Sequence, residues 1–182
     1  MGDPRKQRKK YESPRNPWRQ DQLGAELQLV GEYGLRNKRE LWKSRTALSR
    51  IRGIARSLLA KEESERVRLE KEFLESLCRQ GILPENATID DVLDLDIKDI
   101  LERRLQTLTF RKGFAKSIHQ ARQLVSHGHV KIGPRSISVP GYVVARSEEP
   151  SVKLSQEVAS RISREAKAEE PKGAPASPRP PK

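Results

Sequence analysis

Apolar residues recur every three or four positions through the first half of the chain, which is the spacing of an amphipathic helix. The predicted helices cover residues 21–33, 37–58, 64–80 and a short stretch that begins at Thr88. Asp21 can cap the first helix and Gly34 can end it, while Asn37 and Glu40 have the spacing of a capping box at the start of the second. We therefore predict a helical region over residues 21–95.

The segment 96–147 has the strongest pattern. We predict one continuous helix from about Ile97 to Gly113 and a second from Ser117 to Gly128, since serine favours helix starts and glycine favours helix ends. The stretches "HVKIG" and "SISVPGYVV" alternate or run apolar like strands, and "GPRS" joins them in a tight turn. The predicted fold class is α+β, with a helical N-terminal region followed by two helices packed on a small β-sheet.

Both ends of the chain lack such a pattern. Residues 1–20 hold three prolines and seven basic residues, so we predict a basic extended arm that becomes ordered only on its partner, with Trp18 as an anchor at its end. Residues 148–166 form at most one weak helix, and the rest of segment 148–182 is a disordered tail rich in proline and alanine.

The net charge of +12 is distributed unevenly along the chain. Residues 1–60 hold 15 Lys/Arg against 6 Asp/Glu, whereas residues 61–102 hold 6 against 13. Residues 103–147 hold 9 basic side chains and no acidic one. Two basic blocks separated by an acidic one suggest a polyanion bound at two places. A membrane is not an expected partner, because aromatic residues make up only 4% of the chain.

The sequence lacks the motifs that are typical of enzymes. It contains no Walker loop and no GxGxxG, HExxH or GxSxG motif, and Cys78 is its single cysteine, so neither an internal disulfide nor a cysteine zinc site can form. No run of about 18 apolar residues and no signal-peptide pattern occurs, so a cytoplasmic protein is expected. We expect no cofactor, no metal and no catalytic residue.

The stretch "SHGHV" places two histidines around a helix-ending glycine. His127 and His129 are expected to diverge, and no carboxylate nearby in sequence could orient them as metal ligands or a catalytic pair. A polyanion site uses the same residues, because the helix start at Ser117 offers free N–H groups to phosphate. Arg103 and Arg104 are expected on the solvent side, opposite the leucines of the preceding helix. A solvated helix end is the alternative.

A second basic feature lies on the predicted helix 37–58. Lys38, Arg45, Arg52 and Arg56 are spaced by seven, seven and four residues, so they share one helix face and form a basic ridge behind the apolar stripe. The alternative is an ordinary solvated charged face.

The residues of both basic blocks resemble a known family. "LERRLQTLTFRKGFAKSIHQARQLVSHGHVKIGPRSISVPGYVV" is similar to the S-four RNA-binding domain, with its arginine-rich first helix, the Ala-Arg-Gln of its second helix and the His-Gly-His turn before a hairpin. Upstream, "KKYESPRNPW", "ELQLVGEYGLRNKRELW" and "LSRIRGIARSLL" resemble the small-subunit ribosomal proteins of the S-four family in their archaeal and eukaryotic form. The short tail looks archaeal.

This resemblance implies a non-enzymatic component of the small ribosomal subunit. It implies a primary binder of small-subunit ribosomal RNA that docks on a helical junction of the 5′ domain, nucleates assembly of the subunit body and supports translational accuracy. The implied neighbours are ribosomal protein S-five and messenger RNA where it enters the subunit, with the protein present as a monomer on the cytoplasmic ribosome. A free-standing RNA chaperone or stress protein with an S-four domain is the alternative.

The candidate RNA-binding residues lie in the arm, on the basic ridge and in segment 103–131. In the arm they are Arg5, Lys6, Arg8, Lys9, Lys10, Arg15 and Arg19, and on the second helix they are Lys38, Arg39, Arg45, Arg52 and Arg56. In the third group they are Arg103, Arg104, Lys116, Ser117, His119, Gln120, Arg122, Gln123, Ser126, His127, Gly128, His129 and Lys131.

Overall fold

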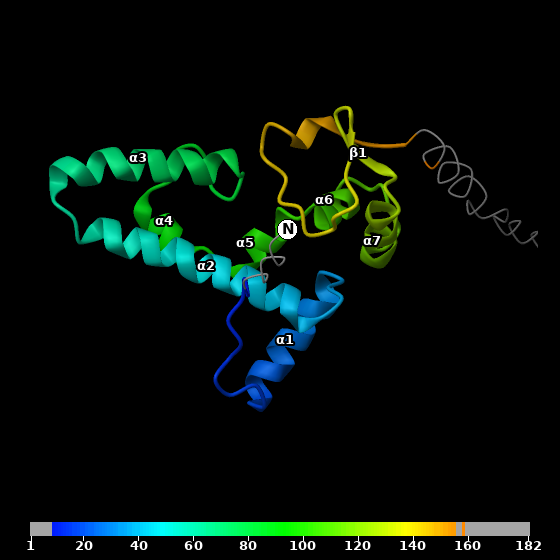
Figure 1. Cartoon of the computed structure of the whole chain (residues 1–182), viewed down its shortest axis with the longest axis horizontal. Coiled ribbons are helices and arrows are strands. Elements are labelled where there is room, and N and C mark those ends of the chain that lie inside the picture. Colours follow the sequence, from blue (N-terminus) through cyan, green and yellow to red (C-terminus); the bar gives the residue numbers. More distant parts are fainter. Residues whose placement is uncertain (1–8, 156–157, 159–182) are drawn as a thin grey trace, which may run out of the picture.

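The computed structural model describes residues 9–155 and 158, and Figure 1 shows the arrangement of their helices and strands. The helices are α1 (Gln20–Glu32), α2 (Lys38–Leu59), α3 (Glu63–Arg79), α4 (Ile89–Asp94), α5 (Ile97–Glu102), α6 (Leu105–Arg111) and α7 (Ile118–Ser126). The strands are β1 (Val130–Ile132), β2 (Arg135–Ser136) and β3 (Val152–Leu154), with a short 3-10 helix η1 (Glu149–Ser151) before β3. The α+β prediction is confirmed.

Helix α2 is the long element that organises the N-terminal region, and it contacts α1, α3, α4 and α5 (Figure 1). Its apolar side chains Leu48, Ala55 and Leu58 are buried against Leu77 of α3 and Val92 of α4. A helix with one apolar stripe must bury that stripe against its neighbours, and here α3 and the short helices α4 and α5 cover it.

Local signals set most helix ends as predicted. The side chain of Asn37 accepts a hydrogen bond from the N–H of Glu40 at 3.3 Å, and Ser117 does the same for Gln120 at 3.2 Å. Asp21 is the exception. It lies inside the first turn of α1, whose N-cap is Arg19, so the predicted cap is wrong.

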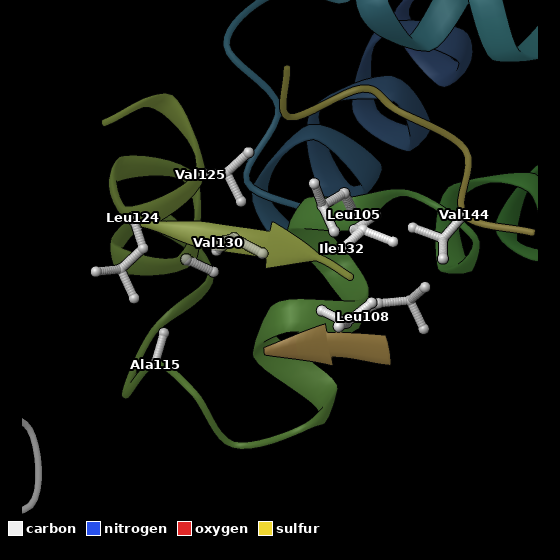
Figure 2. Close-up of a cluster of buried hydrophobic side chains, with 10 residues drawn as sticks. Leu105, Leu108, Ala115, Leu124, Val125, Val130, Ile132 and Val144 are labelled. Atoms are coloured by element: carbon white, nitrogen blue, oxygen red, sulfur yellow. The ribbon is translucent and has the colours of Figure 1, made fainter. Parts of the chain in front are cut away.

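The C-terminal region packs α6 and α7 against the three-stranded antiparallel sheet, whose strand order is β2-β1-β3. Figure 2 shows its core, to which the helices contribute Leu105, Leu108, Leu124 and Val125 and strand β1 contributes Val130. These side chains are at most 8% exposed, so the predicted unit of two helices on a small sheet has a closed core of its own.

The predicted continuous helix from Ile97 to Gly113 is wrong. The chain turns between α5 and α6, and the N–H of Leu105 donates to the carbonyl of Tyr142 at 2.8 Å instead of to the preceding helical turn. The hydroxyl of Thr107 donates to the carbonyl of Leu101 at 2.8 Å and closes the corner. Partners from the distant segment 140–144 therefore replace the helical bonds.

The predicted second strand is also shorter than expected. Only Arg135–Ser136 pairs with β1, and Val143 instead forms an isolated bridge with Arg104. The other edge of β1 pairs with β3, which lies where a weak helix was predicted, so that prediction is wrong for residues 148–155. Apart from Val158, the remainder of the predicted tail lies outside the described residues.

The arm is held against α2 where the structure describes it. The ring of Tyr11 lies 6.0 Å from that of Trp42, and the N–H of Glu12 donates to the hydroxyl of Thr46 at 3.0 Å. The prediction that the arm is ordered only by a partner is therefore wrong for Tyr11 and Glu12. Residues 1–8 lie outside the described residues.

Candidate nucleic-acid interface

One face of α7 presents polar side chains and carries no lysine, arginine or carboxylate. His119, Gln123, Ser126 and His127 are exposed and, at spacings of four, three and one, share one side of the helix. We call these four residues the α7 face. Their hydrogen-bonding groups can act both as donors and as acceptors, which suits ribose hydroxyls and base edges.

Gly128 sets the geometry of the His-Gly-His turn. Its φ of +74° is in the left-handed region, and the N–H of His129 donates to the carbonyl of Leu124 at 3.0 Å, which ends α7. The rings of His127 and His129 are stacked with centroids 6.2 Å apart, so the expectation that they diverge is wrong. No group of three or more metal-ligating side chains forms within the part of the chain that the structure describes.

The sheet adds a cationic surface. Lys131 of β1 faces Ser136 on β2 and Lys153 on β3 directly across the strands, and all three side chains are exposed. We call these three residues the sheet face. Like charges directly opposite each other destabilise a sheet, so an anion placed between the two lysines would be favoured.

The expectation that Arg103 and Arg104 lie on the solvent side is wrong. Arg104 is 7% exposed and its guanidinium lies 2.8 Å from the carboxylate of Glu40. Arg103 pairs with Glu149 at 2.9 Å and donates to the carbonyl of Val144 at 3.0 Å. Carboxylates from outside the acid-free segment therefore neutralise both arginines.

Arg122 belongs to the same cluster. Its guanidinium contacts both oxygens of Glu40, at 2.7 and 3.2 Å, and reaches the side-chain oxygen of Gln106 at 3.2 Å. Burial raises the pKa of Glu40, but hydrogen bonds and charges from Arg122 and Arg104 outweigh it, so the pKa lies below its ordinary value. We call Glu40, Arg104 and Arg122 the inter-region clamp, because Glu40 belongs to α2 and the arginines to the C-terminal region.

Two of the four cations of the predicted basic ridge on α2 are already bound to other groups of the protein. Lys38 pairs with Glu26 at 3.3 Å, and the half-buried Arg52 donates to the carbonyl of Leu95. Arg45 and Arg56 stay exposed, with no ion pair within the described residues.

A second face of α2 carries cations that the sequence interpretation missed. Arg39, Lys43 and Arg50 are exposed at spacings of four and seven, and only Arg39 was a candidate. We call these three residues the α2 face. The α2 face could have been predicted from the sequence, because its residues follow the same helical spacing as Lys38, Arg45, Arg52 and Arg56. Lys153 was missed because its segment was predicted to be helical.

The arm forms a groove with α2. A cavity of about 340 Å³ lies between residues 12–19 and the first half of α2, and its lining includes Arg15, Arg19 and Arg45. Lys9 and Lys10 are exposed, whereas Arg5, Lys6 and Arg8 lie outside the described residues. The structure thus brings candidates together in pairs and triplets on the arm, α2, α7 and the sheet.

Comparison with known proteins gives a consistent result. Residues 103–149 match the family model described as S4 domain. Small ribosomal subunit protein uS4 of Ignicoccus hospitalis is 54% identical over 149 residues, which cover 82% of this chain and 90% of that protein. The same protein of Hyperthermus butylicus is 53% identical over 152 residues, covering 84% and 86%, and that of Metallosphaera sedula is 51% identical over 153 residues, covering 84% and 85%.

The fold and its exposed cations, together with that domain match, define an RNA-binding protein built around an S4 domain. The identities extend well beyond this domain into the N-terminal region. The chain belongs to the family of small ribosomal subunit protein uS4. The predicted family, its archaeal type and the absence of enzymatic function are thereby confirmed. No helix among the described residues has the length and apolarity to cross a membrane.

Proposed function

We propose that this protein is a structural component of the small ribosomal subunit and binds its ribosomal RNA directly, on a helical junction of the 5′ domain, early in assembly of the subunit body. In this role it supports translational accuracy, borders ribosomal protein S-five and the messenger RNA where it enters, and acts on the cytoplasmic ribosome. The supporting observation is that Arg45 and Arg56 on α2 and Lys131 and Arg135 on the sheet are exposed and form no ion pair within the described residues.

The sheet face and the α7 face serve different parts of that binding. Lys131 and Lys153 supply charge for phosphates, which contribute most of the affinity but carry little information about sequence. The polar side chains of the α7 face can form hydrogen bonds with groups that distinguish RNA from DNA, the 2′-hydroxyl above all.

The inter-region clamp fixes where these surfaces lie relative to α2. Because Glu40 contacts Arg104 and Arg122 at 2.7 to 3.2 Å, α2 and α7 are held at a fixed separation. A shape-defined RNA junction is best recognised by basic surfaces whose spacing does not change, since fixing them only on binding costs conformational entropy. The clamp thus has a positioning role, and its arginines do not need to contact RNA.

Salt dependence of binding tests this proposal. The RNA is a transcript of the 5′ domain of the Hyperthermus butylicus small-subunit rRNA, and the variant replaces Arg39, Lys43 and Arg50 by glutamine. If these side chains contact phosphates, the affinity falls and the slope of log K against log salt decreases by about 2 to 3.

A matched control removes the same charge from the acidic region, by replacing Arg68, Lys71 and Arg79 of α3 by glutamine. We expect this variant to keep the wild-type slope. Equal slopes in both variants would contradict a role for α2 in RNA binding. Stoichiometric co-sedimentation with small subunits would separate the proposal from the alternative of a free-standing RNA chaperone, which associates only transiently.

A further inference from the structure

The chain has two tryptophans, and of the two only Trp42 forms a hydrogen bond or ring contact with other described side chains. The indole N–H of Trp42 donates to Glu26 at 3.1 Å, and the ring of Tyr11 stacks on it. Trp18 is 86% exposed and has no hydrogen bond or ring contact to any described residue. An exposed side chain of this size is uncommon, because tryptophan is highly buried on average. The residues that surround Trp18 therefore determine what kind of partner its exposed ring can bind.

Those surroundings are cationic. Trp18 shares a surface hollow with Arg15 and Arg19, which also line the adjoining groove of about 340 Å³ together with Arg45. None of the three arginines forms an ion pair within residues 9–155 and 158, and Glu12 is the single acidic residue of the groove lining there. Unpaired charges of one sign around an exposed ring favour an anionic partner that also has a flat apolar face.

The segment is also restrained before any partner arrives. Pro14 and Pro17 limit its backbone, and the hydrogen bond from the N–H of Glu12 to the hydroxyl of Thr46 ties it to α2. A side chain presented on a restrained segment loses less conformational entropy on binding than one on a free arm. Trp18 is therefore held beside the groove.

We propose that Trp18 is a base-stacking residue, on which an unpaired nucleotide of the bound RNA places its base while Arg15, Arg19 and Arg45 contact the neighbouring phosphates. This inference rests on the proposed function and adds the nucleotide site. Stacking on an indole suits any base because every base has a π-face, and arginine beside it adds cation–π attraction. The low aromatic content of 4% argues against a platform for several bases, so the site takes a single base.

Tryptophan fluorescence tests the stacking directly, because Trp42→Phe leaves Trp18 as the single emitter. Titration with the 5′-domain transcript should quench its emission strongly and protect it from acrylamide. Independently, Trp18→Ala should weaken binding about 5- to 150-fold, the loss expected for one stacked base. Trp18→Phe should retain most of the affinity. Leu27→Ala, which removes an exposed apolar side chain on the neighbouring helix α1, should keep the wild-type affinity.

The outcomes separate this inference from the proposed function. If the transcript binds tightly while Trp18 emission and the affinity of Trp18→Ala stay unchanged, base stacking is refuted, RNA binding stands and Trp18 is left to contact a protein. If the wild-type protein does not bind the transcript, the proposed function fails. Should Trp42→Phe lose its circular dichroism signal, the difference in quenching between the wild type and Trp18→Phe reports the same contact.

Discussion

Replacing Glu40 by glutamine should destabilise the protein by about 3 kcal/mol. The substitution keeps the shape of the side chain but removes the negative charge from the inter-region clamp. It leaves Arg104, whose side chain is 8% exposed, without a counter-ion, whereas Arg122 keeps the oxygen of Gln106 at 3.2 Å. The buried arginine therefore carries most of the cost.

The magnitude follows from the burial of the three side chains. Removing one partner of a fully buried ion pair costs about 3 to 5 kcal/mol, and an exposed pair is worth about 0 to 1 kcal/mol. Glu40 and Arg122 are each 22% exposed, which places the clamp toward the buried end of that range. One acceptor oxygen of the new glutamine can still hold an arginine, so a loss of about 2 to 4 kcal/mol is expected.

Thermal unfolding followed by circular dichroism measures this loss. At about 2 to 4 °C per kcal/mol for a chain of this size, the melting temperature should fall by roughly 6 to 12 °C at pH 7. Glu75→Gln is the matched control, because Glu75 is exposed on α3 and its carboxylate has no ion pair among the described residues. A Glu40→Gln melting temperature equal to that of the control would refute the role of the clamp.

Acid should remove the difference between wild type and Glu40→Gln. Because Arg122 and Arg104 hold the pKa of Glu40 below its ordinary value despite burial, the native state favours the carboxylate. The stabilisation is complete above the unfolded pKa of about 4.3 and is lost as the pH falls through the lower folded value. Melting temperatures that stay equally far apart from pH 7 down to about pH 3 would contradict this linkage.

Two further predictions concern the sheet and its turn. Lys153→Glu places a negative charge directly across from Lys131, so it should stabilise the free protein by about 0.5 kcal/mol in urea unfolding. The same substitution should weaken binding of the 5′-domain transcript. A loss of stability would contradict the cross-strand register. Gly128→Ala should lower the melting temperature more than Gly113→Ala. Both glycines have φ near +73°, but of the two only Gly128 has an atom close to the new Cβ, the hydroxyl oxygen of Ser136 at 3.2 Å. Equal losses would show that this contact is relieved at no cost.

The elements that the sequence predicted well have local causes. The starts of α2 and α7 depend on Asn37 and Ser117, each three residues from the N–H that it caps, and the end of α7 depends on Gly128 itself. The break at Arg103 and Arg104 has no such local signal. It depends on carbonyls of the distant segment 140–144, which take over the hydrogen bonds of the first turn of α6. Strand β3 escaped prediction for the same reason, because it exists only as the partner of β1.

The candidate site also has features that the sequence predicts and features that depend on tertiary contacts. The sequence by itself determined that charge is segregated, with nine basic and no acidic side chains over residues 103–147, and that an S-four-type unit contains them. Only the tertiary structure decided which cations remain available. Glu40, Glu102 and Glu149 lie outside that segment and neutralise four of its arginines, while Lys131 and Arg135 have no ion pair within the described residues. Charges pair by distance in space, which a linear pattern of residues does not specify.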